Sequence, residues 1–70
     1  MSEIQAILFD RNYWTLKEAH TWLNEHSFYP IKRAHQTNQK IRFRLECPKK
    51  YRRFRTKRLT SGIELILGFK

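Results

Sequence analysis

The chain has 70 residues, of which 40% are hydrophobic and 14% aromatic, and its formal net charge is +9. This length allows one domain with a small core, and the aromatic content is too high for a disordered polyelectrolyte. The single cysteine, Cys47, excludes an internal disulfide and indicates a reducing compartment, and its position predicts a small apolar residue at a strand end. The first ten residues lack the pattern of a secretory signal. We therefore expect one intracellular domain spanning residues 1–70.

The net positive charge arises entirely in the second part of the chain. Residues 1–31 carry two basic and four acidic side chains, whereas residues 32–70 carry thirteen basic side chains against Glu46 and Glu64. Such a one-sided charge attracts polyanions. A membrane is excluded as the partner, because the sequence has neither a long apolar span nor a basic amphipathic helix. Nucleic acid is the polyanion that we expect.

The first part of the chain predicts a strand followed by a helix. The apolar segment at residues 3–9 is typical of a buried strand, and a turn at residues 10–12 ends it. Thr15 and Glu18 have the spacing of a capping box, so a helix is expected to begin at Thr15 and to end near His26, before Pro30. Its apolar stripe contains Leu16, Ala19 and Leu23, with Trp22 on one flank.

The second part alternates between apolar and polar residues, as strands do. Residues 40–47 predict a half-buried strand with a cationic outer face, and residues 31–37 its hairpin partner across a turn at residues 37–39. Ser61 and Gly62 predict a turn before a final strand at residues 62–69, where Ile66 indicates that the helix or another chain covers its second face. The order predicts an α+β fold, a small antiparallel sheet of about four strands with one helix on a face.

The run KKYRRFRTKR at residues 49–58 has seven basic side chains, with Tyr51 and Phe54 among them. We interpret it as a folded edge anchored by these aromatic residues. Alternation would then direct Arg53, Arg55 and Lys57 outward, beside the outer face of residues 42 and 44, to form one positive patch. The expected nucleic-acid contacts are Arg42, Arg44, Lys49, Lys50, Arg52, Arg53, Arg55, Lys57 and Arg58, with Tyr51 stacking on a base.

These residues predict a protein that binds duplex DNA through phosphates, with little sequence preference. A solvated charged face and a nuclear-import signal are alternative interpretations of the run. The rival function is an interaction or scaffold module that binds an acidic protein or forms a homodimer through a strand edge. We expect neither catalysis nor a metal or other cofactor. The sequence has no nucleophile with an adjacent base, and His20 and His26 are too far apart on the helix to share a metal.

The segments WTLKEAHTWLNEHSFYPIK, RFRLECP, FRTKRL and GIELILG resemble a short domain that recurs in proteins of tailed phages and large DNA viruses, often beside head or prohead-protease domains. The resemblance extends over residues 7–68. Its motifs are carried by Trp14, Thr15, Glu18, Ala19, Trp22, Leu23, His26, Arg42, Arg44, Arg55 and Gly62. The resemblance implies a viral protein associated with the virion, with a capsid protein as a partner, or located in the host cytoplasm or nucleus. It implies no protease activity.

Overall fold

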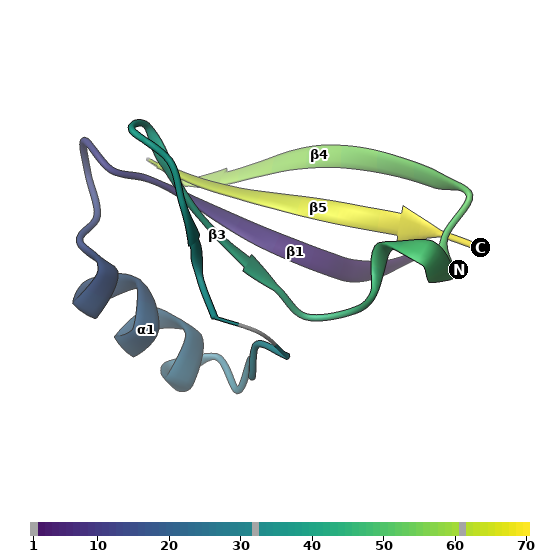
Figure 1. Cartoon of the computed structure of the whole chain (residues 1–70), viewed down its shortest axis with the longest axis horizontal. Helices are drawn as coiled ribbons and strands as arrows, with labels where there is room; N and C mark the ends of the chain where they lie inside the picture. Colours follow the sequence, from purple (N-terminus) through teal and green to yellow (C-terminus); the bar gives the residue numbers. More distant parts are fainter. Residues whose placement is uncertain (1, 32, 61) are drawn as a thin grey trace.

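Five antiparallel strands and one helix make up the computed structural model, which describes residues 2–31, 33–60 and 62–70 (Figure 1). The elements are β1 (Ser2–Asp10), α1 (Leu16–Glu25), β2 (His35–Gln36), β3 (Lys40–Arg44), a 3₁₀ turn η1 (Pro48–Lys50), β4 (Arg53–Thr60) and β5 (Ile63–Phe69). The sheet has the order β2-β3-β1-β5-β4. The α+β class is thus confirmed. The described sheet has five strands where about four were predicted, because most of the basic run forms β4.

The helix has the bounds and caps that its sequence predicts. The hydroxyl of Thr15 accepts from the Glu18 amide at 3.2 Å, and the Glu18 carboxylate accepts from the Thr15 amide at 3.0 Å. At the other end Ser27 adopts a left-handed conformation with φ of 59°, and the Phe28 amide donates to the carbonyl oxygen of Leu23 at 2.9 Å. These contacts satisfy backbone groups that have no partner within the helix, so nearby residues alone determine where α1 begins and ends.

The core lies between α1 and the middle of the sheet. Ala19 and Leu23 of the helix pack against side chains from three strands, which are Ile7, Phe9, Ile41, Phe43, Ile63 and Leu65. Phe9 is the centre of an aromatic cluster, with ring centroids 5.4 Å from Trp14, 5.7 Å from Trp22 and 5.6 Å from Phe43. Because edge-to-face contacts add to the burial of apolar area, this cluster is a main source of stability.

Strand register assigns every strand residue to one of two faces, since direct cross-strand partners project to the same side. Ile7 pairs with both Phe43 and Leu65, which pack against α1, and these residues define the covered face. Leu8 pairs with Arg42 and Glu64 on the opposite side, which we call the uncovered face. Figure 1 shows α1 on only one side of the sheet.

Ile66 belongs to the uncovered face, because it pairs with Ala6, the neighbour of Ile7. The helix therefore does not cover Ile66, and the prediction that the helix packs on this apolar side chain is wrong. The alternative, contact with another chain, stays a prediction. Leu8, Ile66 and the 46% exposed Phe54 give this face an apolar centre.

The hairpin differs from its predicted extent at both ends. The turn forms as expected, with the Thr37 amide donating to the Lys40 carbonyl oxygen at 2.8 Å, but β2 has only two residues. The amide of Leu45 donates to the carbonyl oxygen of Gln5, which lies at the irregularity in β1, and β3 already ends at Arg44.

The predicted apolar strand-end position of Cys47 is wrong, because the cysteine lies beyond the strand and is exposed. Lys32 and Ser61, in the predicted hairpin and turn, lie outside the described residues.

Candidate nucleic-acid interface

The basic side chains of β3 and β4 lie on different faces of the sheet. Arg42 is the cross-strand partner of Leu8, on the uncovered face, and Arg44 lies two residues further along the same face. Arg55 pairs with Leu67, and Lys57 pairs with Leu65, so both project from the covered face. β1 and β5 also separate β3 from β4. The prediction of one patch that joins Arg42 and Arg44 to Arg53, Arg55 and Lys57 is therefore wrong.

The error concerns which face of the sheet each alternate set of β4 side chains occupies. Arg53, Arg55 and Lys57 alternate with Phe54, Thr56 and Arg58, as predicted, but the register with β5 directs the second set to the uncovered face. β4 is an edge strand, so α1 does not bury the first set although it projects to the same side as the helix. Arginines 53 and 55 consequently stay exposed beside the helix-covered core. The chain presents two cationic surfaces in place of one.

The first surface lies on the uncovered face at the β2 side of the sheet. Arg33, His35, Arg42 and Arg44 line a hollow of about 180 Å³, and we call these four residues the β3 cluster. His35 is the cross-strand partner of Arg42, which brings the hairpin strand β2 into this group. The guanidinium of Arg42 donates to the Gln5 side-chain oxygen at 3.5 Å, and its Nε is buried with no hydrogen-bond partner among the described residues. Arg42 thus also packs against the sheet, whereas Arg33 is exposed.

The second surface lies at the start of β4. Arg52, Arg53, Arg55, Phe69 and Lys70 line a hollow of about 550 Å³, and we call these residues the β4 cluster. The guanidinium carbon of Arg55 lies 5.9 Å from the centroid of the Phe69 ring, within the range of a cation–π contact. An arginine held against an aromatic ring keeps its donors directed outward, as phosphate binding requires.

Carboxylates neutralise lysines here and leave the arginines of both clusters unpaired. Within the described part of the chain, the ion pairs are Lys40 with Glu64, Lys50 with Glu46 at 3.0 Å, and Lys70 with Glu3 at 3.3 Å. The hydrogen bond from Lys70 lowers the pKa of Glu3, and the one to Glu46 raises the pKa of Lys50. No arginine of the β3 or β4 cluster forms an ion pair with a described carboxylate. These guanidinium groups are therefore available to an external anion.

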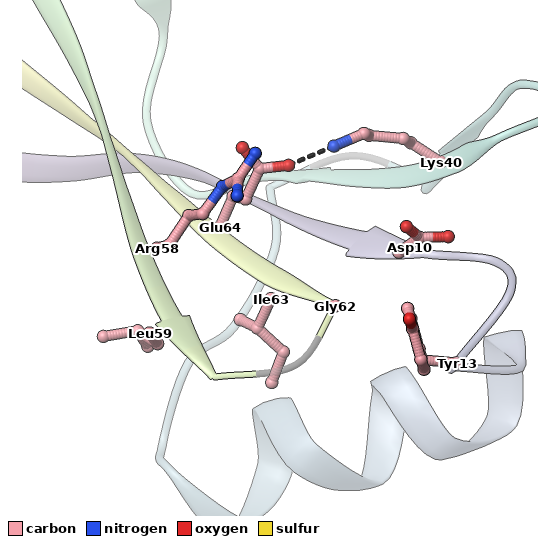
Figure 2. A pocket seen from close by; sticks show the side chains of 8 residues that line it. All are labelled: Asp10, Tyr13, Lys40, Arg58, Leu59, Gly62, Ile63 and Glu64. Carbon is pink, nitrogen blue, oxygen red and sulfur yellow. Dashed lines mark hydrogen bonds and ion pairs between the residues drawn. The ribbon is translucent and has the colours of Figure 1, made fainter.

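The remaining predicted contacts lie outside both clusters. Lys49 is exposed in η1, and Lys57 is exposed further along β4. Arg58 is the cross-strand partner of Glu64 on the uncovered face. Figure 2 shows Arg58 and the Lys40–Glu64 ion pair around a cavity of about 400 Å³, with Asp10 and Tyr13 beyond them. Because this cavity has two carboxylates beside its two cations, it is a poor site for a polyanion.

Tyr51 is not the stacking residue that the sequence suggests. Its ring is 7% exposed and lies against the backbone of Gly68, and its hydroxyl donates to Glu3 at 3.4 Å. Burial raises the pKa of the Tyr51 hydroxyl, as expected for a phenol removed from water. Phe54, whose ring centroid lies 6.0 Å from that of Tyr51, is the exposed aromatic residue of the run. Phe54 therefore replaces Tyr51 as the candidate for contact with a base.

Gly68 is required for this packing, and its substitution gives a test. A Cβ atom at position 68 would lie 2.5 to 2.7 Å from three ring carbons of Tyr51. We expect Gly68→Ala to lower the free energy of unfolding by about 1–3 kcal/mol, the usual cost of overpacking, as measured by urea denaturation. The same substitution made together with Tyr51→Ala should cost much less, because the ring is gone. An equal cost in both backgrounds would show that the Tyr51 ring is not what Gly68 accommodates.

Sequence reasoning missed Arg33, His35, Phe69 and Lys70 as members of the two clusters. The predicted hairpin contained Arg33 and His35, but their position beside Arg42 depends on a register that the weak alternation of residues 31–37 does not define. Phe69 was assigned only to the alternating final strand. In the described residues, no helix is long and apolar enough to cross a membrane, and no group of three His, Cys, Asp or Glu side chains is arranged to hold a metal ion.

No family model matches the chain, and neither the curated proteins nor the solved structures that were compared with it give a significant match. The resemblance to a phage and viral domain therefore stays a prediction.

Proposed function

We propose that the protein binds duplex DNA without sequence preference, through phosphate contacts from the arginines of the β3 and β4 clusters. The observation that carries this proposal is the distribution of the ion pairs. Three of the described carboxylates form ion pairs with lysines 40, 50 and 70, and none forms an ion pair with an arginine of either cluster.

The chemistry of arginine supports a phosphate partner. A guanidinium donates two parallel hydrogen bonds to phosphate oxygens and is weakly hydrated, so it loses little on binding. Each phosphate contact also releases a condensed counterion from the duplex, which is a favourable term that does not depend on base sequence. Phosphate contacts carry no sequence information by themselves, so we expect little preference among base sequences.

Binding should weaken steeply with salt. If one duplex engages about four cations, the logarithm of the association constant should fall with the logarithm of the salt concentration with a slope of about −3.6. Fluorescence polarisation with a labelled duplex at several salt concentrations measures this slope, and a second duplex of scrambled sequence should give the same line. Absent binding at low salt, or affinity indifferent to salt, would refute the proposal.

A second candidate function is binding of an acidic protein segment, which the position of β4 favours. β4 is an eight-residue edge strand, and edge strands accept an additional strand from a partner. Its basic side chains would oppose pairing with β4 of another copy and favour an acidic strand. A complex that purifies with protein and without nucleic acid, and that resists competition by DNA, would support this candidate over the first.

A further inference from the structure

We infer that one molecule holds two DNA segments at once, with the β3 cluster on one segment and the β4 cluster on the other. This inference rests on the proposed function and adds to it a bridging activity. It follows from the placement of the two clusters on opposite faces and toward opposite edges of the same sheet.

The separation of the clusters follows from strand order and register. β3 and β4 are three strand spacings apart, or about 14 Å, with β1 and β5 between them. Arg44 projects from the uncovered face, whereas Arg53 and Arg55 project from the covered face. Arg44 and the pair of Arg53 and Arg55 thus leave the sheet in opposite directions. Neither cluster extends the other into a single surface.

A straight duplex that lies on one face of the sheet contacts only the cluster of that face. The molecule measures 31 × 21 × 19 Å, so a duplex that reached from one face to the other would have to turn back over roughly its own width. Bending a site of about 20–30 bp by only 40–90° already costs on the order of 1–6 kcal/mol, and this turn is far sharper. Contact of both clusters with DNA therefore requires two separate segments.

Each cluster has the features of a phosphate site by itself. Both are hollows lined by three arginines, of about 180 Å³ for the β3 cluster and about 550 Å³ for the β4 cluster. The only carboxylate paired with a member of either cluster is Glu3, on Lys70, among the described residues. Two cationic sites on one sheet also reduce the repulsion between the two duplexes, because cations lie between them.

The test compares two variants with equal charge. Arg33→Gln with Arg44→Gln weakens the β3 cluster, and Arg53→Gln with Arg55→Gln weakens the β4 cluster, each lowering the formal net charge from +9 to +7. Arg42 is left unchanged because it packs on Gln5. Circular dichroism of each variant verifies that the fold is intact. Sedimentation with excess short duplex then gives the number of duplexes in each complex.

The expected result is one protein with two duplexes for the unmodified chain and one protein with one duplex for each variant. With one duplex immobilised and the second labelled, recruitment of the second should fall at least tenfold in both variants, because two lost contacts weaken a site about 60-fold at 0.1 M salt. One duplex per unmodified protein, or loss of all binding in a single variant, would overturn the bridging inference and leave the proposed function standing.

Bridging by a dimer gives a different result. A complex of two proteins and two duplexes, with recruitment lost in one variant and retained in the other, would also overturn the inference, since each subunit would then use one surface. Failure of the unmodified protein to bind any duplex at low salt would refute the proposed function, and the inference with it. Stoichiometry and binding thus test the two proposals separately.

Discussion

Replacing Phe9 with alanine is expected to remove a large part of the protein's free energy of unfolding. Phe9 is fully buried and contacts the rings of Trp14, Trp22 and Phe43, so its removal leaves a cavity among these three rings. Substitutions of this kind cost about 3–5 kcal/mol. A chain of this length has a total stability of about 3.5–10 kcal/mol, taken at about 0.05–0.15 kcal/mol per residue. The loss is thus a large part of the total.

The adjacent residue provides the control. Leu8→Ala also shortens an apolar side chain in β1, but Leu8 is only partly buried and projects from the uncovered face, away from α1. It should therefore cost much less than Phe9→Ala. Urea or thermal denaturation followed by circular dichroism measures both. Equal losses for the two variants would mean that the core does not lie on the side of the sheet assigned to it.

Neutralising two arginines in each cluster is expected to weaken DNA binding strongly at physiological salt. The variant with Arg33, Arg44, Arg53 and Arg55 all changed to glutamine loses two contacts from each surface. Since each contact contributes roughly tenfold near 0.1 M salt, the affinity for a single duplex should fall about 60- to 100-fold. All four guanidinium groups lie outside the hydrophobic core, so the fold should persist. Fluorescence polarisation measures the loss.

Two controls separate charge from shape. The same four positions changed to lysine keep the formal charge, so most of the affinity and nearly all of the salt dependence should remain, with some loss because lysine cannot make the bidentate contact. The glutamine variant should keep the thermal midpoint of the original chain. Unchanged DNA affinity in the folded glutamine variant would show that the binding surface lies elsewhere.

Local sequence predicted the helix well because its determinants are only a few residues apart. Thr15 and Glu18 form the capping box within one turn, and the stripe containing Ala19 and Leu23 is buried as expected. The alternation of residues 40–44 likewise indicated which side chains of β3 reach the core. In each case the residues that decide the structure are neighbours in the chain.

The candidate site was only partly predictable, because it depends on pairing between distant residues. The basic run specifies that Arg53 and Arg55 share a face, but only the register with Leu67 in β5 determines which face. Tyr51 looked exposed among cations, yet the absence of a side chain at Gly68 gives its ring a place to pack. A shift of one residue in the pairing of β4 with β5 would move Arg53 and Arg55 to the opposite face of the sheet, and no local pattern reveals that shift.

The position of β5 between β1 and β4 has a consequence for synthesis in the cell. β1 is made before the other elements and can pair early with β3 along one edge, but its other edge has no partner until β5 has emerged. Because β1 and β5 pair late, folding is favoured after the whole domain has been translated, and β1 is a target for chaperones until then. The pairing of Ser2 with Phe69 also places the start of β1 beside the end of β5. A circularly permuted chain, opened at the hairpin turn near Asn38, should therefore build the same sheet.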